Sequence, residues 1–335
     1  MADARGMRAL VMTGFGLSDK NIAVQNMPLP ECKANDLLIR VAAAGVNPVD
    51  WKECEGFLQP FYGVYENKWI PGYDAAGIVE RVGAHVSRFV RGDRVVLFSD
   101  RRDNGHNGTF ADYVRVLPSA VAKVPSHVDL AEAAAIPTAA LTGYQALIAA
   151  NKASLKAGNL VLIHGASGGV GSYAVQFAKS AGLKVAATCS AQNADFVTSL
   201  GADLVIDYSR DDIVRSVRNW APQGMHAVID CVSGGTLPDA LDALRTGGKL
   251  ISIATLTQDG DIAAETSRAA ERGCEKLLSI MNFDRIGEEL AEILALMARG
   301  EVKSPPLTRY PLDRGADALE HMKRGGVRGK IVITM

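Results

Sequence analysis

Three glycines stand three residues apart in the stretch LVLIHGASGGVGSYAVQFAKSAG, which covers residues 160–182. A turn without Cβ atoms lets the main chain approach a pyrophosphate closely, and the start of a helix offers free N–H groups to an anion. The apolar run before the glycines and the helical pattern after them are the context that such a turn needs. The stretch therefore predicts a phosphate cradle for a dinucleotide, formed by Ala166, Ser167, Gly168, Gly169, Val170 and Gly171.

The end of the next apolar run, KVAATCS, indicates which dinucleotide binds. Folds that bind NAD carry an acid about 20 residues after the glycines, where it accepts a hydrogen bond from the ribose 2′-hydroxyl. Counting from Gly171 leads to Ser190, which can donate to a 2′-phosphate. Asp195 lies a helical turn later and is interpreted as a solvated cap. This pattern favours NADPH.

The residue types that hold zinc are not grouped in the sequence. The five cysteines are scattered without a CxxC motif, and the six histidines show no HxxxH spacing. Zinc sites need thiolate and imidazole ligands close together, so no metal site is expected. An odd number of scattered cysteines is typical of a reducing compartment and predicts a cytoplasmic protein. His164, beside the glycines, is interpreted as a strand-end residue.

The chain has 335 residues, of which 48% are hydrophobic and 22% charged, with a formal net charge of −1. This composition is ordinary for a globular protein and gives no basic surplus for binding nucleic acid. The N-terminus has no apolar core of a secretory signal. The apolar stretch 133–150 contains Pro137, Thr138, Thr142 and Gln145, and it predicts a buried helix rather than a membrane span.

Two domains are expected from the elements that must position these residues. Short β-type runs punctuated by Gly, Pro and Asp fill residues 7–125 and predict an antiparallel, barrel-like domain. From about residue 129, strands and helices alternate at the spacing of a parallel sheet. The C-terminal part returns to one helix and short strands. We therefore expect an α/β protein with one domain formed by 1–128 and 284–335 and a second formed by 129–283.

Several ordered segments resemble the medium-chain dehydrogenase/reductase superfamily, on its zinc-free NADPH:quinone oxidoreductase (zeta-crystallin-like) branch. The resemblance covers nearly the whole chain, and its strongest element is the cradle segment 158–179. The others are AAGVNPVDWK (43–52), PGYDAAGIVERVG (71–83), GDRVV (92–96), GADLVIDY (201–208) and GGVRGKIVI (325–333). The resemblance implies a GroES-like β-barrel catalytic domain, a Rossmann domain that binds NADPH in the cleft between them, and a homo-oligomer, here a homodimer, joined through the Rossmann domain.

The resemblance also implies site residues. The family places a hydroxyl, a lysine and a tyrosine at the 2′-phosphate; Ser190 and Tyr208 match, whereas Asn193 stands at the lysine position. Tyr208 could instead be an aromatic residue that covers the end of the sheet. Residues expected near the nicotinamide are Thr138, Thr142, Cys231, Val232, Ala254 and Thr255.

The candidate catalytic residues come from the segment GVNPVDWK and are Asn47, Asp50 and Lys52. Asn47 could equally be a turn residue before a proline. Lys52 could stabilise a developing oxyanion or form an ion pair with Asp50. The aromatic residues of 56–74 border the substrate cleft in the family, where flat rings would suit a quinone, but they could also pack on the barrel.

Zinc alcohol dehydrogenases of the same superfamily carry their metal ligands at positions that here are Asn47, Tyr73 or Asp74, and Thr138. Without a Lewis acid, the acceptors expected are conjugated, because their negative charge spreads and hydrogen bonds can stabilise it. The sequence thus predicts NADPH-dependent hydride transfer to a small-molecule quinone or other conjugated carbonyl. The alternatives are an NADPH-dependent reductase of alkenal or enoyl double bonds, and an NADPH-binding protein with a structural or regulatory role.

Overall fold

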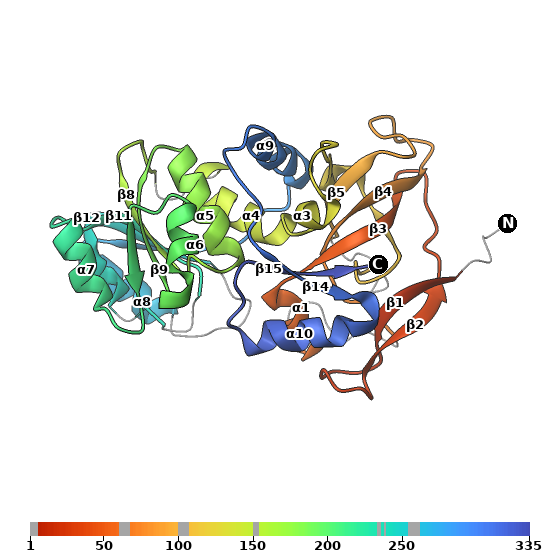
Figure 1. Cartoon of the computed structure of the whole chain (residues 1–335), viewed down its shortest axis with the longest axis horizontal. Helices are drawn as coiled ribbons and strands as arrows, with labels where there is room; N and C mark the ends of the chain where they lie inside the picture. The colour runs from red at the N-terminus through yellow and green to blue at the C-terminus, as the bar shows by residue number, and fades with distance from the viewer. Residues whose placement is uncertain are drawn as a thin grey trace. The chain divides into compact units, whose positions relative to one another are not determined.

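The computed structural model describes residues 6–59, 68–99, 107–149, 154–232, 236–237, 239–253 and 262–335. Contacts divide the chain into two compact units (Figure 1). The first contains Met1–Ala139, Phe283–Ala298 and Pro306–Met335, and the second contains Ala140–Asn282 and Arg299–Pro305. The first unit thus extends beyond residue 128, where the sequence placed the boundary, because helix α3 (Leu130–Ala134) packs on strands of that unit.

The first unit is mostly β-structure, with helices from both ends of the chain. Its strands are β1 (Gly6–Met12), β2 (Ile22–Pro28), β3 (Leu37–Val46), β4 (Asp74–Val82), β5 (Arg94–Phe98), β6 (Tyr113–Val116), β7 (Val121–Lys123), β14 (Leu307–Pro311) and β15 (Lys330–Thr334). Its helices are α1 (Pro48–Cys54), α3, α9 (Ile286–Ala298) and α10 (Gly315–Arg324), with short turns η1 (Pro118–Ala120) and η5 (Leu312–Arg314). Helix α4 (Pro137–Tyr144) begins in this unit and continues into the second.

One large sheet of the first unit has the strand order β14-β15-β3-β4-β5-β7, with β6 also paired to β3, and β1 and β2 form a separate antiparallel pair. Pairing in the large sheet is antiparallel except between β14 and β15, which run parallel. Strand β3 therefore lies between β15, which comes from the C-terminus, and β4. This arrangement brings the ends of three strands that are far apart in the sequence to one place.

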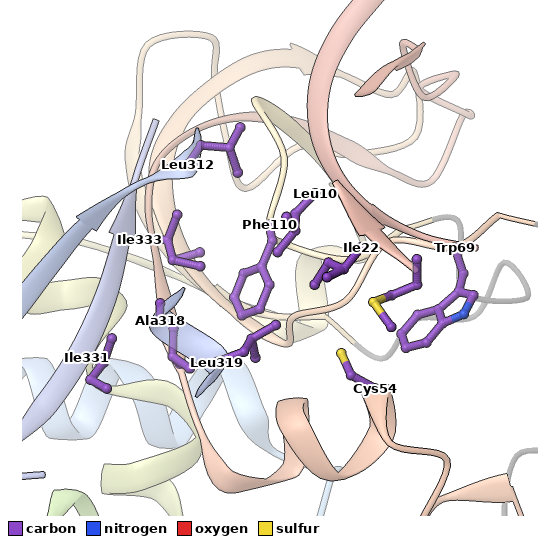
Figure 2. Packing of buried hydrophobic residues seen from close by; sticks show 13 residues of the cluster. Leu10, Ile22, Cys54, Trp69, Phe110, Leu312, Ala318, Leu319, Ile331 and Ile333 are labelled. Atoms are coloured by element: carbon purple, nitrogen blue, oxygen red, sulfur yellow. The ribbon is translucent and has the colours of Figure 1, made fainter. Parts of the chain in front are cut away.

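A hydrophobic cluster of the first unit holds α1, α10 and β15 together. Figure 2 shows Ala318 and Leu319 of α10 beside Ile331 and Ile333 of β15, with Cys54 at the end of α1 nearby. All of these side chains are fully buried. Close packing of this kind resists movement, so it fixes the start of β15 relative to α1.

The second unit is a parallel α/β structure. Its strands are β8 (Leu160–His164), β9 (Lys184–Cys189), β10 (Leu204–Asp207), β11 (Met225–Asp230), β12 (Leu244–Ile253) and β13 (Glu275–Ser279). Its helices are α5 (Gly169–Ser180), α6 (Ala194–Ser199), α7 (Ile213–Trp220) and α8 (Ile262–Glu271), with the short turns η2 (Gln145–Ala149), η3 (Ala191–Asn193) and η4 (Ala240–Ala243).

The strand order of this sheet is β10-β9-β8-β11-β12-β13, and every pair is parallel (Figure 1). Numbered along the chain, the order is 3-2-1-4-5-6, which is the order of dinucleotide-binding folds. The order reverses between β8 and β11. Ligands of such sheets bind outside the carboxyl ends of the strands at this point, which is where the predicted cradle follows β8.

Residues 133–147 of the apolar stretch are largely buried, as expected, but they do not form one helix. Helix α3 ends before Pro137, which begins α4, and α4 continues into a π-helical turn, η2. A proline lacks the N–H group that would continue the preceding helix, but it suits the first position of a new one. Among the described residues, no helix is both long and apolar enough to span a membrane.

Candidate active site

The glycine turn lies between β8 and α5 of the second unit. Gly165 has a positive φ of 77°, a conformation that side chains rarely adopt. The Gly168 amide donates to the Gly165 carbonyl over 3.1 Å, and the Ser172 amide donates to the Gly168 carbonyl over 3.0 Å. Gly168 is thus the N-cap of α5, and the chain turns from strand to helix within four residues.

The glycine turn has room for a phosphate at Gly168 but not at Gly171. A Cβ on Gly171 would lie 2.2 Å from the Gly165 carbonyl oxygen, so this glycine is needed for the strand and helix to pack. A Cβ on Gly168 would meet only that same oxygen, at 3.4 Å, and would otherwise project into open space. The two glycines therefore have different roles. Gly171 permits the fold, and Gly168 leaves room that a ligand can use.

The amides of Gly169, Val170 and Gly171 belong to the first turn of α5, where main-chain N–H groups have no partner within the helix. This first turn contains no acidic side chain. The positive end of the helix dipole therefore faces the turn without a neighbouring negative charge in that turn. A pyrophosphate fits these residues.

Ser190, Asn193 and Ser167 are brought together beside the cradle. The Asn193 side chain is buried, and its Nδ2 donates to the Ser190 hydroxyl over 3.1 Å and to the Ser167 hydroxyl over 3.3 Å. Both serine oxygens thus accept from Asn193, which leaves their own O–H groups to donate elsewhere. Asn193 orients two hydroxyls rather than presenting its own amide to solvent.

The end of β10 lies next to the end of β9. The Tyr208 amide donates to the Cys189 carbonyl, and Tyr208 is 54% exposed. Asp207 pairs with Cys189, so Tyr208 and Ser190 each follow the last paired residue of neighbouring strands. Sequence reasoning missed the neighbouring Asp207. Its carboxylate accepts two hydrogen bonds from Ser209, which with the Ala191 amide lower the pKa of Asp207. Asp207 ends β10, whereas the spacing rule for the acidic residue of NAD-binding folds leads only to the end of β9.

The end of β11 lies beside the cradle as well. Cys231 donates its amide to the His164 carbonyl over 3.2 Å, and the Val232 side chain, 46% exposed, lies against Gly165. Burial raises the pKa of the Cys231 thiol, so this group is not a thiolate. Thr142 is buried in α4. The predicted residues 254 and 255 lie outside the described part of the chain.

His164 connects two strand ends below the cradle. Its Nδ1 lies 2.8 Å from the Thr188 hydroxyl, and that hydroxyl accepts the Gly165 amide over 3.1 Å. Burial lowers the pKa of His164. The histidine thus supports the start of the glycine turn from behind, which agrees with its interpretation as a strand-end residue.

In the first unit, Asn47 and Asp50 lie at the start of α1, where Pro48 is the first helical residue. The Asp50 Oδ2 accepts the Asn47 main-chain amide over 2.6 Å, while its Oδ1 has no hydrogen-bond partner. Asn47 is 2% exposed and Asp50 is fully buried. Both residues therefore hold the helix start, and Asp50 makes its bond with Asn47 rather than with Lys52.

Asp74 lies at the centre of a buried polar network. It begins β4 and accepts the Asn47 Nδ2 over 2.8 Å, the Thr138 hydroxyl over 2.6 Å and the Thr138 amide over 3.0 Å. Because Thr138 lies in the first turn of α4, the carboxylate also faces the positive end of that helix. On the other side of Asn47, the Lys330 ammonium donates to the Asn47 Oδ1 and, over 2.9 Å, to the Val46 carbonyl.

Sequence reasoning did not identify Lys330 as a site residue, and it named Asp74 only as one of two residues at a zinc-ligand position of related enzymes. Lys330 begins an apolar strand, and Ile331 beside it pairs with Val46 of β3, so sheet register brings the lysine to Asn47. Gly45 of β3 pairs with Asp74 of β4. The signal that could have found Lys330 is a lysine directly before a run of buried apolar residues.

Lys52 is half-buried in α1, with its Nζ 5.8 Å from the centre of the Trp51 ring. Trp51 packs edge-to-face on Phe57, which is 49% exposed. Tyr73 stacks on Phe98 and is buried. Trp69 is buried in the cluster of Figure 2. The aromatic residues at 61, 62 and 65 lie outside the described part of the chain.

The positions that hold zinc in metal-dependent relatives do not suit zinc in this chain. They supply an amide, a carboxylate and a hydroxyl at Asn47, Asp74 and Thr138, with neither thiolate nor imidazole. The Lys330 ammonium is already bonded to the Asn47 oxygen, and a second cation there would be repelled. In the part of the chain that the structure describes, no three His, Cys, Asp or Glu residues are grouped so as to hold a metal ion.

Comparisons with known proteins agree with the fold. Residues 33–126 match the family model of the alcohol dehydrogenase GroES-like domain, and residues 200–333 match that of zinc-binding dehydrogenases. The 3-2-1-4-5-6 sheet, the cradle and these matches define an oxidoreductase of the medium-chain dehydrogenase/reductase superfamily, which uses a nicotinamide cofactor.

Individual relatives narrow this class. The chain is 34% identical over 334 residues to the chloroplast envelope quinone oxidoreductase homolog of Arabidopsis thaliana, covering 98% of each protein. It is 31% identical to the NADPH-dependent alkenal/one oxidoreductase of the same plant, over 98% of this chain and 79% of that protein. The structure of the quinone oxidoreductase from Coxiella burnetii matches with a TM-score of 0.86 and 30% identity, over 99% of this chain and all of that one. The chain belongs to the quinone oxidoreductase family of the superfamily.

Proposed function

We propose that this protein reduces quinones or other conjugated carbonyl compounds with NADPH. The observation that carries the proposal is the cradle: an open Gly168 at the N-cap of α5, beside a serine hydroxyl at the end of β9. Relatives named quinone oxidoreductase and NADPH-dependent alkenal/one oxidoreductase, each similar over nearly the whole of this chain, support it. The cofactor, when bound, supplies a hydride to the acceptor.

The residues of the second unit hold the cofactor in this proposal. The first-turn amides of α5, with Ser167, bind the pyrophosphate, and Ser190 and Tyr208 bind the 2′-phosphate. Asn193, which the sequence analysis also places at the 2′-phosphate, orients both serine hydroxyls through its Nδ2. Asp207, ionised and close to the Ala191 amide, opposes a 2′-phosphate by its charge. The preference for NADPH over NADH is therefore positive and modest.

In the first unit, Lys52 is the group that we assign to the developing oxyanion of the substrate. Asn47 and Asp50 are buried, whereas Lys52 is half-buried, with its Nζ 5.8 Å from the centre of the half-buried Trp51 ring, which packs on the exposed Phe57. A single ammonium stabilises charge less than a zinc ion does. A conjugated acceptor, which delocalises the charge, is the substrate class that such a group suits.

Quinone and enone substrates are tested together. The oxidation of NADPH is followed by its absorbance over matched panels of 1,4-quinones, α,β-unsaturated aldehydes and saturated aldehydes, with NADH in parallel. We expect turnover of conjugated acceptors and none of the saturated ones. Faster turnover of the unsaturated aldehydes would favour the double-bond reductase, and binding of NADPH without turnover of any acceptor would contradict the proposal.

The role of Lys52 is tested with Lys52→Met and Lys52→Arg on the preferred acceptor. We expect kcat to fall about tenfold or more in the first and to recover in part in the second, because arginine keeps the charge.

The homodimeric state and the cytoplasmic location stay predictions; light scattering of the purified protein measures the oligomeric state.

A further inference from the structure

Lys330 is a buried amine with an unusual set of partners. The residue is 2% exposed, and its Nζ donates to the Val46 carbonyl and to the Asn47 side-chain oxygen. Burial lowers the pKa of Lys330, while Asp74 and Asp50 raise it. An ammonium group is kept in such a place only where acceptors and negative charges surround it.

The Asn47 amide is bound at both ends. Its oxygen faces the Lys330 ammonium, and its nitrogen donates to the Asp74 carboxylate over 2.8 Å. Turning the amide over would place an NH₂ group against an ammonium and an oxygen against a carboxylate. The lysine and the aspartate together therefore allow one orientation of Asn47.

The hydrogen bonds that orient Asn47 continue through Asp74 to the start of α4. Three groups donate hydrogen bonds to Asp74: the Asn47 Nδ2, the Thr138 amide and the Thr138 hydroxyl. A carboxylate that only accepts is the ionised form. The chain of bonds thus runs from Lys330 through Asn47 and Asp74 to the hydroxyl of Thr138.

We propose that Lys330 is a positioning residue of the reductase: its buried ammonium binds Asn47 and is the countercharge of Asp74, which in turn accepts hydrogen bonds from Thr138. It does not touch the substrate. By fixing Asn47 and neutralising Asp74, it holds the first turns of α1 and α4 in place. The activity part of this inference rests on the proposed reductase function.

Four titratable groups face one another here: Asp50 and Glu53 of α1, Asp74 of β4 and Lys330 of β15. Burial raises the pKa of Asp50 well above its usual range, and the charges of Asp74 and Glu53 add to this. Burial also raises the pKa of Asp74, opposed by Lys330 and the Thr138 hydroxyl. The ammonium therefore balances Asp74 in particular.

Without Lys330, Asp74 is a buried anion with no countercharge, so its pKa in the folded state rises further. A raised folded-state pKa contributes stability below the unfolded-state pKa, and this is lost as the pH rises through the folded-state pKa. The stability lost in Lys330→Met should thus grow as the pH rises above the unfolded-state pKa of an aspartate, about 4. Lys330→Met/Asp74→Asn carries neither charge and should regain stability without this pH dependence.

The experiment compares Lys330→Met, Lys330→Arg, the double variant and Lys20→Met, a control at an exposed lysine of the same unit. Denaturant unfolding is measured across the pH range. For each variant, kcat is measured per folded molecule, and the Kd for NADPH is measured by fluorescence. The proposal expects kcat to fall about ten- to a hundredfold in Lys330→Met with little change in the Kd, because the cradle belongs to the other unit.

The double variant separates positioning from stability alone. We expect it to regain stability but not kcat, because Asn47 has lost the ammonium that orients it. If the double variant regains both, or if Lys330→Met keeps the kcat of the control, Lys330 does not position the site. If Lys330→Met does not fold, the kcat of the double variant is compared with that of the control instead. Failure of the proposed function would show differently, as an inactive wild type whose Lys330 variants still change stability with pH.

Discussion

Gly168 and Gly171 lie three residues apart in the same turn, yet the structure predicts opposite consequences for the same substitution. Gly168 has φ −80°, an ordinary conformation, and a Cβ added there meets only one atom, at 3.4 Å. Gly168→Ala should therefore fold, with its free energy of unfolding changed by less than about 1 kcal/mol. A methyl group there projects into the space that a pyrophosphate would use.

The expected loss of affinity follows from the contacts that the methyl group prevents. Displacing a phosphate from the first-turn amides removes one charge-assisted hydrogen bond, which typically contributes about 1.5–3 kcal/mol. The Kd for NADPH should then rise about tenfold to a hundredfold, equivalent to about 1.4–2.8 kcal/mol. Gly168→Val should weaken binding further, because its side chain is larger.

Gly171→Ala is the matched control. Its Cβ would lie 2.2 Å from the Gly165 oxygen and 2.7 Å from the Ala166 Cα, so strand and helix must separate. It should lose about 1–3 kcal/mol of stability even without cofactor. Both variants are compared by thermal unfolding of the cofactor-free protein and by fluorescence titration with NADPH. A folded Gly168→Ala protein that binds NADPH as tightly as the wild type would refute the assignment of the cradle.

Four further predictions follow from named side chains. The wild type should prefer NADPH to NADH about ten- to a hundredfold in kcat/KM, and Ser190→Asp should invert this preference by repelling the 2′-phosphate; an unchanged ratio would show that Ser190 does not contact the 2′ position. Asp207→Asn should increase the same preference, because it removes a carboxylate whose pKa is lowered and which is therefore ionised at neutral pH; a decrease would mean that Asp207 supports the phosphate site. Asp50→Asn should gain stability relative to the wild type as the pH rises, because burial raises the pKa of Asp50 and its neutral form is the stable one; denaturant unfolding at several pH values measures this, and a constant loss would contradict it. Chelators should leave the activity unchanged, and elemental analysis should find no zinc in proportion to the chain; a stoichiometric zinc lost together with activity would contradict a metal-free site.

The fold was predictable where the signal is local. The glycines of the cradle, the strand before them and the helix after them follow one another in the sequence, and each has a pattern of its own. The repeated alternation of strand and helix then implied the parallel sheet, whose order the structure shows to be 3-2-1-4-5-6. The boundary of the first unit was less accessible, because it depends on helix α3 packing on strands that lie far away in the sequence.

The cofactor side of the site was only partly predictable for the same reason. Ser190 could be reached by counting along one βαβ unit, whereas Asp207 approaches it from the next strand. The role of Asn193 depends on two hydrogen bonds of its amide, to Ser167 and Ser190, and no spacing rule contains them. The resemblance placed Asn193 where relatives carry a lysine, but it could not show that Asn193 bridges Ser167 and Ser190.

The first unit shows most clearly why residue type alone does not assign a role. Asn47 and Asp50 are polar residues in a segment that resembles a catalytic motif, and both qualify as candidates until their bonds are known. In the structure, the oxygen of the Asn47 side-chain amide accepts from Lys330 and its nitrogen donates to Asp74. Asp50 accepts the main-chain amide of Asn47 at the start of α1. We propose Lys52, which is half-buried, for contact with the substrate, and Lys330, which is buried, for positioning the site.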